Sequence, residues 1–530
     1  MKSNVIINAV DLQSYAFDCI FEGKSAFEKV LDWAMKTSDS GNIFVLLSSK
    51  ETQNCQFTAS IEKYQKIKPL TLLCYDDWNR CTLFAHLAEC TEEDVPLVYA
   101  FGDTPFLDTA ITNQILQQHD EFKGEYSFAD GYPVGISPEV LDKGLVSILK
   151  NLVTQDERYT PIPLTRESIF DTLKVEINSY EIETVIAPYD YRYLRFTFAC
   201  DRQLHQNLCK KVFDLSLQQE NAGRQIYDLA KENTDCLAPL PAYYSIQIAS
   251  YCGGKCTYCP YPREYEKKMG HNPCFAKEKN PQCFMSLENY KELITKISDY
   301  SKEAYICLSH FGEATMHPQL KDIIALSLQY PKLQLVIETT GEGLSEKLVE
   351  ELVSVATSYE KGLERLIWIV SLDAFDEEKY KELHGDNQSL GKAVALLEYL
   401  QKYFSVYAQF IRMNENEAQL ENFYRYWKEK NCVLIQKYDS FCGLLPQRKV
   451  TDLAPVIRNP CWHLRRDMNI LVDGDVTLCK SACLSAIIGN ALKEELPAIF
   501  AKQKEIINLH LNNQYKDLCK DCDEYYTFNF

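Results

Sequence analysis

Three closely spaced cysteines carry the clearest chemical signal in this sequence. Cys252, Cys256 and Cys259 follow a predicted β-strand with the spacing C-x3-C-x2-C, and Gly253 and Gly254 allow the loop between them to fold tightly. Cysteine thiolates that converge on one side of a loop are the ligands of iron–sulfur clusters. Because only three ligands are local, the spacing predicts a [4Fe–4S] cluster whose fourth iron stays open to a small molecule.

A zinc site and three unrelated core cysteines are the alternative interpretations of this segment. Structural zinc sites usually combine two C-x2-C pairs or add histidines, and no partner pair lies near residue 259 in the sequence. A zinc site would favour a non-catalytic adaptor protein. Metal analysis separates these possibilities, because a cluster brings iron and acid-labile sulfide whereas the adaptor would bring zinc.

The cysteine spacing, with an aromatic Tyr258 before the last cysteine, resembles the signature of the radical SAM superfamily. This resemblance implies that the open iron binds the amino and carboxylate groups of S-adenosylmethionine. It also implies that one electron then yields methionine and a 5′-deoxyadenosyl radical. A low-potential electron donor such as flavodoxin or ferredoxin is the implied partner.

Three later segments match the supporting motifs of that superfamily. LSHFGEATMHP resembles the Gly-Glu motif that contacts the methionine amino group, although Ala314 stands where proline is common, and VSLDA resembles the ribose-contacting segment. IRMNEN places an arginine where a cation could meet the methionine carboxylate, with a structural salt bridge as the alternative. The implied S-adenosylmethionine contacts are Gly312, Glu313, Ser371, Asp373 and Arg412.

Four cysteines near the C-terminus predict a second metal site. Cys461 is followed by twelve residues, then Gly474, then four residues before Cys479, and an Asp-Gly turn would return the second thiolate beside the first. Cys519 and Cys522 form a later C-x2-C pair. These four residues predict a second [4Fe–4S] cluster, with a zinc ribbon as the alternative.

This C-terminal pattern resembles the opening of the SPASM domain, a module that binds auxiliary clusters. A full SPASM domain continues with further cysteines, and this chain ends at Phe530, so the expectation is the shortened single-cluster form called twitch. Cys274 and Cys283 are a possible further pair without identifiable partners, for which packing or a loop position is the expectation. Cys483 is a spare nearby thiol that is not assigned.

Alternating strand and helix patterns must position the first cysteine set. From residue 243 to 450 they predict repeated βα units, and hence a partial parallel (β/α)6-type barrel with its chemistry at the carboxyl ends of the strands. Residues 451–530 change to a two-strand unit turning at residues 473–475, a long helix near Leu492–Leu511 and the cysteine-bearing tail. The predicted barrel strands are Ser245–Ala249, Ala304–Ser309, Leu333–Glu338, Leu366–Leu372 and Val406–Ile411.

A separate α/β domain is predicted over residues 1–212, followed by a helical linker over 213–242. Helices are expected near Ala26–Met35, Thr109–His119 and Pro138–Leu149. The expected strands are Asn4–Val10, Ile43–Leu47, Leu70–Leu73, Leu97–Phe101 and Leu194–Ala199.

The segment VYAFGDTPFLDTAITNQILQQH in this domain resembles the strand–Gly-Asp–helix segment of sugar-activating nucleotidyltransferases. In working members an aspartate like Asp103 binds magnesium and a Gly-rich loop holds the triphosphate. Here that loop lacks the glycines and the arginine, with only Gly23 and Lys24 as stand-ins, so the expectation is a degenerate domain that docks a substrate or partner.

A nucleotidyltransferase-like N-terminus, a radical SAM core and a shortened SPASM tail together resemble the spiro-SPASM protein family. The sequence does not identify the substrate. The implied activity is reductive cleavage of S-adenosylmethionine followed by hydrogen abstraction from a sugar, a nucleotide-sugar or a peptide. The alternatives are a nucleotidyltransferase with structural metal clusters and a maturase that modifies peptides or proteins.

Composition limits the partners and the compartment. The 530 residues carry a formal net charge of −19, which argues against a nucleic-acid partner. The sequence contains no secretory signal and no apolar run of about 18 residues, so neither secretion nor a membrane span is expected. With 21 cysteines and no such signal, a reducing cytoplasmic location is the expectation.

Overall fold

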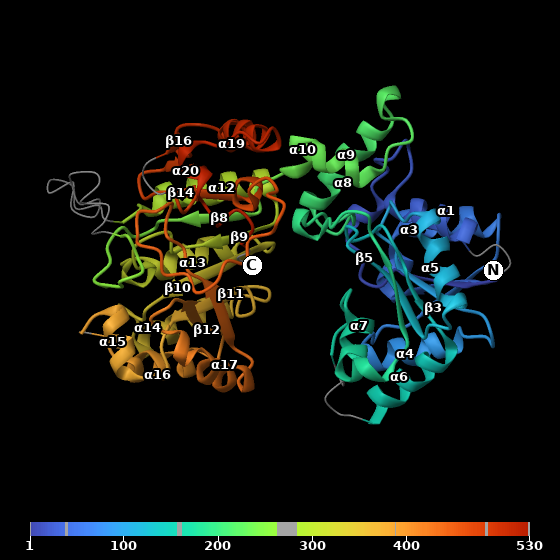
Figure 1. The fold of residues 1–530 in the computed structure, drawn as a ribbon, viewed down its shortest axis with the longest axis horizontal. Coiled ribbons are helices and arrows are strands. Elements are labelled where there is room, and N and C mark those ends of the chain that lie inside the picture. Colours follow the sequence, from blue (N-terminus) through green and yellow to red (C-terminus); the bar gives the residue numbers. More distant parts are fainter. Residues whose placement is uncertain are drawn as a thin grey trace. The chain divides into compact units, whose positions relative to one another are not determined.

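The computed structural model describes residues 2–37, 41–155, 162–261, 284–386, 388–482 and 486–527. The chain forms two compact units, Met1–Pro239 and Leu240–Phe530, and each unit has its own β-sheet (Figure 1). The predicted α/β class is therefore confirmed. Residues 213–239, predicted as part of a linker, belong to the first unit. Cys274, Cys283 and Cys483 lie outside the described residues.

A seven-stranded sheet forms the centre of the first unit, with the order β3-β2-β1-β4-β6-β5-β7. All neighbouring strands are parallel except β6, which runs antiparallel to β4 and β5. The inner strand β1 is apolar in its middle and buried at every position, as expected for a strand covered on both faces. The strands are β1 (Asn4–Asn8), β2 (Ile43–Leu47), β3 (Leu70–Cys74), β4 (Leu97–Phe101), β5 (Tyr126–Asp130), β6 (Glu139–Leu141) and β7 (Ile182–Ile186).

Helices flank this sheet, and α4 and α6 pack on each other (Figure 1). The last three helices, α8, α9 and α10, also pack together within the first unit. The α-helices are α1 (Ala26–Thr37), α2 (Ser49–Gln53), α3 (Cys55–Gln65), α4 (Arg80–Glu89), α5 (Thr109–Glu121), α6 (Lys143–Gln155), α7 (Ser168–Leu173), α8 (Gln203–Ser216), α9 (Ile226–Glu232) and α10 (Thr234–Leu237).

In the first unit one predicted strand is wrong, and one predicted helix begins later than expected. No strand forms over Leu194–Ala199: a 3-10 helix ends at Leu194, and Arg195 has a left-handed φ of 50°, which breaks the extended chain. The predicted helix from Pro138 is instead strand β6 followed by α6, because the Asp142 carboxylate accepts a hydrogen bond from the Leu145 amide at 2.5 Å and thereby caps the helix start.

A nine-stranded sheet forms the second unit, with the order β13-β12-β11-β10-β9-β8-β14-β15-β16. The six strands β8 to β13 pair in parallel and in chain order, and the labels β8 to β12 follow one another across this unit in Figure 1. The five predicted strands therefore form within a few residues of their expected bounds. Closure of the sheet into a partial barrel stays a prediction. These strands are β8 (Tyr243–Ile246), β9 (Ala304–Cys307), β10 (Leu333–Thr339), β11 (Leu366–Ser371), β12 (Ser405–Arg412) and β13 (Val433–Lys437).

The C-terminal hairpin extends the same sheet. β14 (Asp467–Ile470) pairs in parallel with β8 and antiparallel with β15 (Asp475–Thr477), which pairs with β16 (Ile487–Asn490). The sequence predicted the hairpin but not its pairing with β8. That pairing brings the segment from residue 461 beside the parallel strands.

Helices connect the parallel strands of the second unit and follow the hairpin. The predicted last helix starts later than expected, at Leu496, because Pro497 is favoured in the first helical turn. The helices are α12 (Leu287–Ser301), α13 (Leu320–Leu328), α14 (Glu346–Ala356), α15 (Glu377–His384), α16 (Leu390–Leu400), α17 (Leu420–Glu429), α18 (Trp462–Arg466), α19 (Leu496–Leu511) and α20 (Asp517–Lys520).

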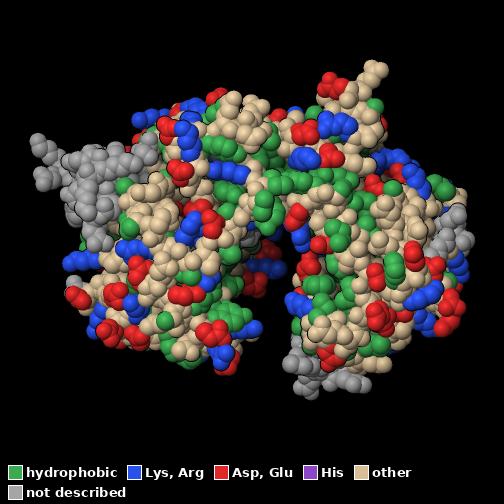
Figure 2. All heavy atoms as spheres, in the orientation of Figure 1, with side chains coloured by type: hydrophobic (Ala, Val, Ile, Leu, Met, Phe, Trp, Pro, Cys, Tyr) green, Lys and Arg blue, Asp and Glu red, His purple; other side chains and the backbone are tan. Residues whose placement is uncertain are grey.

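Acidic and basic side chains are interspersed on the visible face of both units (Figure 2). Within the described ranges, every helix is too short or too polar to cross a lipid bilayer.

Candidate metal centres

The three cysteines of the first set lie on the loop that follows β8. A Cβ atom added at Gly254 would lie 3.3 Å from the Cys252 sulfur and 3.7 Å from the Cys256 sulfur, so both thiols turn toward the same point. The Cys259 thiol is close enough to act electrostatically on both. Burial raises the pKa of Cys252 to about 12, so a cation must bind before this thiol becomes a thiolate.

Two glycines bring neighbouring loops against the cysteine loop. A Cβ at Gly253 would lie 2.3 Å from Glu342, whose carboxylate accepts a hydrogen bond from the Gly253 amide at 3.0 Å. Gly312 has a φ of 91°, and a Cβ there would lie 2.0 Å from the Ala249 carbonyl oxygen. At Gly312 only glycine fits, because the close atom belongs to the backbone and φ is positive. Glu342, which follows β10, was not predicted.

The Gly-Glu turn lies next to the cysteine loop. The Glu313 amide donates to the Tyr251 carbonyl at 2.7 Å, one residue before Cys252. Its carboxylate accepts hydrogen bonds from the Thr315 hydroxyl at 2.8 Å and from the Thr340 hydroxyl at 2.9 Å. Burial raises the pKa of Glu313. The structure therefore joins the predicted Gly312–Glu313 motif to the first cysteine set.

Asp373 forms a buried network beneath Cys256. Its carboxylate accepts a hydrogen bond from the Tyr258 hydroxyl at 2.7 Å and lies 3.2 Å from Nε2 of His384. Nδ1 of the same histidine is 3.5 Å from the Cys256 sulfur. The Asp373 and His384 side chains are fully buried, and Asp373 has a strained φ of 56°. His384 was missed, because a single histidine at the end of α15 has no local pattern.

Ser371 and Arg412, the other predicted S-adenosylmethionine contacts, already have protein partners. The Ser371 hydroxyl donates to the Gln409 side-chain oxygen at 2.8 Å. The Arg412 guanidinium donates two hydrogen bonds to Glu417, at 2.8 and 2.6 Å. Any ligand contact by Arg412 has to share or replace this ion pair.

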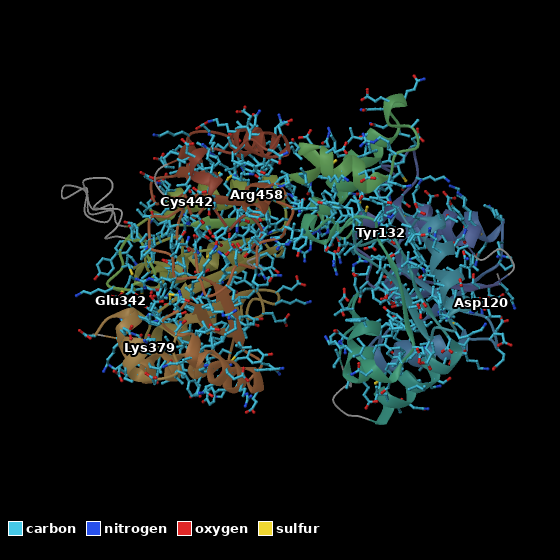
Figure 3. All side chains as sticks on the ribbon, in the orientation of Figure 1. Asp120, Tyr132, Glu342, Lys379, Cys442 and Arg458 are labelled. Carbon is cyan, nitrogen blue, oxygen red and sulfur yellow. The ribbon has the colours of Figure 1, made fainter. Side chains whose placement is uncertain are left out.

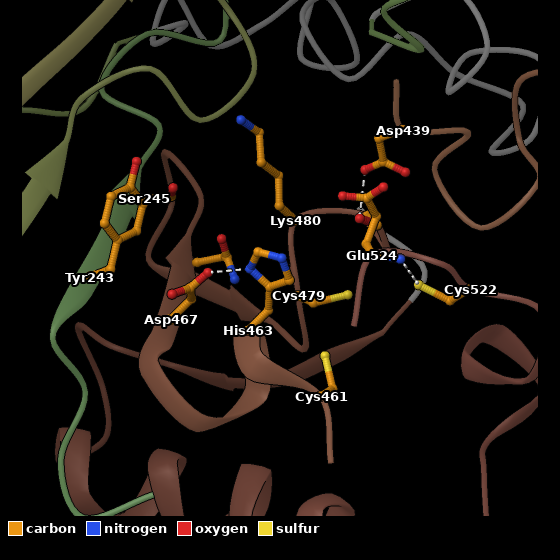
Figure 4. A pocket seen from close by; sticks show the side chains of 12 residues that line it. Tyr243, Ser245, Asp439, Cys461, His463, Asp467, Cys479, Lys480, Cys522 and Glu524 are labelled. Carbon is orange, nitrogen blue, oxygen red and sulfur yellow. Dashed lines mark hydrogen bonds and ion pairs between the residues drawn. The ribbon is translucent and has the colours of Figure 1, made fainter. Parts of the chain in front are cut away.

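The four C-terminal cysteines meet in the second unit. Cys461, Cys479 and Cys522 line one pocket, and their sulfurs point into a common space in Figure 4. Cys519 is within electrostatic reach of the Cys461 and Cys479 thiols, and burial raises its own pKa to about 11. The structure thus brings together all four residues that the spacing singled out.

Separate contacts hold the tail against the hairpin. The Trp462 amide donates to the Tyr525 carbonyl at 2.8 Å, and the Arg458 guanidinium donates to the carbonyls of Cys519 and Lys520 (Figure 3). The Arg458 guanidinium also stacks on the Tyr525 ring, 4.7 Å from its centre. Gly474 has a φ of 86°, as the predicted turn requires.

Backbone amides already donate to two of these sulfurs. The Ala482 amide donates to the Cys479 sulfur at 3.2 Å, and the Glu524 amide donates to the Cys522 sulfur at 3.4 Å. Lys480, next along the chain, points away from the cysteines in Figure 4, and its ammonium lies 3.6 Å from Glu338 on β10. Amide donors to sulfur stabilise thiolate ligands, so the site suits an iron–sulfur cluster.

Neither set is arranged as a compact site for one ion. In the part of the chain that the structure describes, no three His, Cys, Asp or Glu side chains gather tightly enough to hold a single metal ion. A [4Fe–4S] cluster does not require that arrangement, because each thiolate binds a different iron.

Comparison with known protein families assigns both regions. Residues 246–426 match the family model described as the radical SAM superfamily, and residues 461–523 match SPASM, an iron–sulfur cluster-binding domain. An uncharacterized protein of Treponema pallidum (strain Nichols) is 37% identical over 375 residues, which cover 68% of this chain and 98% of that protein. Residues 246–426 are thus a domain of the radical SAM superfamily. Membership in this superfamily implies an enzyme that uses S-adenosylmethionine, and the two matched domains imply iron–sulfur clusters.

Two solved structures are similar to parts of this radical SAM protein. One is a crystal structure of BtrN in complex with AdoMet and 2-DOIA, with a TM-score of 0.33, 18% identity and coverage of 53% of this chain and 93% of that chain. The other is a cytidylyltransferase from Leptospira borgpetersenii serovar Hardjo-bovis, with a TM-score of 0.34, 14% identity and coverage of 43% and 92%.

The histidine beside Cys256 leads to a testable prediction for the radical SAM site. We expect a His384→Phe variant to hold a first cluster that is harder to reduce, because the hydrogen bond to a cluster sulfur stabilises the more negative, reduced state. At a fixed reductant potential the ratio of reduced to oxidised cluster should fall about tenfold. This change corresponds to a reduction potential about 59 mV lower for a one-electron couple. A redox titration followed by electron paramagnetic resonance measures this shift.

His119→Phe is the matched control for that measurement. His119 is also a buried histidine, but it lies in the first unit, where its Nδ1 is 2.8 Å from the Ser127 hydroxyl. An unchanged potential in a His384→Phe protein with full iron content would contradict the role given to the histidine.

Proposed function

We propose that this protein reductively cleaves S-adenosylmethionine at the first cysteine set and abstracts hydrogen from a sugar, nucleotide-sugar or peptide substrate. The observation that carries the proposal is the convergence of the Cys252 and Cys256 thiols around Gly254, next to the Gly312–Glu313 turn. When bound, a [4Fe–4S] cluster with one open iron supplies the electron for this cleavage.

The side chains of the first site bind and orient the cofactor. Cys252, Cys256 and Cys259 would hold three irons and leave the fourth for the methionine end of the cosubstrate. The Glu313 carboxylate lies next to this loop, where a carboxylate is a suitable partner for the methionine ammonium group. The Asp373–His384 pair fixes the position of Cys256 from below.

The second site would hold an auxiliary [4Fe–4S] cluster on Cys461, Cys479, Cys519 and Cys522. We propose that it accepts an electron after hydrogen abstraction or anchors the substrate. Lys480 supports this role, because it follows a cluster ligand and its ammonium lies near Glu338 on β10 and near the Cys259 thiol. A polar substrate between the two sites would meet this ion pair.

The first unit is proposed to dock a substrate or partner rather than to transfer nucleotides. Asp103, the residue that resembles a magnesium ligand, is 2% exposed and pairs with the Arg166 guanidinium at 2.5 Å. The same guanidinium lies 3.7 Å from Asp201. The Arg166 guanidinium thus occupies the space beside the Asp103 carboxylate, where a magnesium ion would have to bind. This arrangement disfavours the nucleotidyltransferase alternative.

Removing the Asp103 side chain tests whether the first unit only docks a substrate or partner. We expect Asp103→Ala to lower the stability of the first unit by about 3 kcal/mol, because Arg166 loses its closest partner in a mostly buried site. Cleavage of S-adenosylmethionine should stay within about twofold of the unmodified protein, since the cluster ligands are unchanged. Thermal unfolding and 5′-deoxyadenosine formation measure the two effects. Loss of cleavage in folded protein would refute the docking role.

The decisive experiment for the proposed function uses anaerobically reconstituted protein. With S-adenosylmethionine and a strong reductant, we expect 5′-deoxyadenosine to form in protein that contains iron and acid-labile sulfide. Zinc in place of iron, with no product, would refute the proposal and favour an adaptor.

The partners and the compartment complete the proposal. All 18 cysteines in the described ranges are free thiols. We propose a cytoplasmic location with a flavodoxin or ferredoxin as electron donor, and membership in the narrower spiro-SPASM family.

A further inference from the structure

Five of the described cysteines, rather than the four predicted, meet at the second metal site. Cys442 follows β13 and lies in the second unit (Figure 3), where its thiol forms a hydrogen bond with the Cys522 thiol and is within electrostatic reach of Cys479. The two thiols are therefore direct neighbours at this site.

The backbone around Cys442 is built to hold this thiol in place. Phe441, Cys442 and Gly443 have consecutive left-handed φ values of 53°, 55° and 79°. Residues other than glycine rarely adopt this region, so the surrounding structure must enforce the turn. Asp439 does so: one carboxylate oxygen accepts from the Phe441 amide at 2.6 Å, and the other accepts from the Ser481 hydroxyl at 2.6 Å.

The Ser481 contact ties the turn to the second site, because Ser481 lies two residues after Cys479. The other side of the turn faces the first site. The Phe441 ring packs in apolar clusters that include Cys256 and Cys259, and it lies 5.9 Å from the Phe311 ring. Phe441 thus shares its apolar clusters with the first cysteine set, whereas the adjacent Cys442 interacts with the second set.

We propose that Cys442 is an exchangeable fifth ligand of the second site, which can replace Cys522 on the same iron. This inference rests on the proposed function. Each iron of a [4Fe–4S] cluster takes one protein ligand, so two adjacent thiols compete for one iron. In the exchange, the iron–sulfur bond to Cys522 breaks, the bond to Cys442 forms, and the Cys442 proton moves to Cys522 along the existing hydrogen bond. No electron is transferred, and the charge of the site is unchanged.

The test uses the full chain with Cys252, Cys256 and Cys259 all changed to Ala, so that only the second site holds iron. In this background we compare Cys442→Ala, Cys522→Ala and the double variant, with Cys519→Ala as the matched control because the described residues place no fifth thiol beside it. Iron, acid-labile sulfide and the paramagnetic resonance spectrum of the reduced protein are measured after anaerobic reconstitution.

We expect Cys442→Ala and Cys522→Ala each to keep about four irons per chain, and the double variant and Cys519→Ala to keep less than about one. In the Cys522→Ala protein, an added Cys442→Ser change should shift the resonance spectrum, because an oxygen ligand replaces sulfur. The same serine change with Cys522 present should leave the spectrum unchanged.

Three results would overturn the proposal: loss of the cluster in Cys522→Ala alone, loss of it in Cys442→Ala alone, or its retention in the double variant. A parent protein that binds zinc, or no iron at all, would instead refute the proposed auxiliary cluster and this inference with it.

Discussion

In a Cys256→Ala variant we expect 5′-deoxyadenosine formation to fall by at least about a hundredfold. Removing a residue that only orients a metal ligand typically lowers metal affinity or activity about 10–100-fold. Here a ligand itself is lost. Only Cys252 and Cys259 would remain as ligands. Because the site is buried, another ligand cannot easily take the place of the lost thiolate. Iron should fall from about eight to about four atoms per chain, because the second site is untouched.

The measurement is anaerobic reconstitution followed by iron analysis and chromatography of the nucleoside product. Cys432→Ala serves as the control, since Cys432 is also in the second unit and is 2% exposed, but its sulfur contacts only the Trp427 carbonyl and neighbouring groups. That variant should keep both clusters. Cleavage at the normal rate by the Cys256→Ala protein would mean that the first cysteine set is not the site of this reaction.

The double change Cys461→Ala and Cys479→Ala should separate cleavage from complete turnover. We expect it to remove about half of the iron, because the hairpin supplies two of the four predicted ligands of the second cluster. Reductive cleavage without substrate should stay within about threefold, since the three cysteines of the first set are unchanged. Conversion of the substrate, once it is identified, should be lost.

A second pair of buried cysteines provides the control. Cys200 and Cys209 lie in the first unit and hydrogen-bond to each other, so changing both to Ala removes as many buried thiols without touching either metal site. This control should retain about eight irons per chain. If the hairpin variant also kept all its iron, the C-terminal cysteines would not ligate a cluster.

Local patterns in the sequence were sufficient for several features of this protein. The C-x3-C-x2-C spacing places its ligands within one loop, so no distant contact is needed to predict them. The apolar runs predicted five of the six parallel strands of the second unit, β8 to β12, because buried parallel strands are rich in apolar residues. The Asp473–Gly474 turn predicted the C-terminal hairpin for the same reason, since a turn is set by its own residues.

Local patterns failed where neighbouring residues conflicted. The apolar run at Leu194–Ala199 reads as a strand, yet a left-handed Arg195 ends the extended chain and the segment packs without pairing along a sheet. Its burial, rather than a ladder of hydrogen bonds, accounts for its apolar character.

Only the tertiary structure decided which distant residues complete the two metal sites. His384 reaches Cys256 from the end of α15, and Glu342 holds the Gly253 amide from the loop after β10. Cys442 joins the second cysteine set because Asp439 accepts hydrogen bonds from both the Phe441 amide and the Ser481 hydroxyl, which ties the turn after β13 to the segment after Cys479. Such single residues have no spacing to mark them, since their partners are fixed by packing between segments that are far apart in the chain.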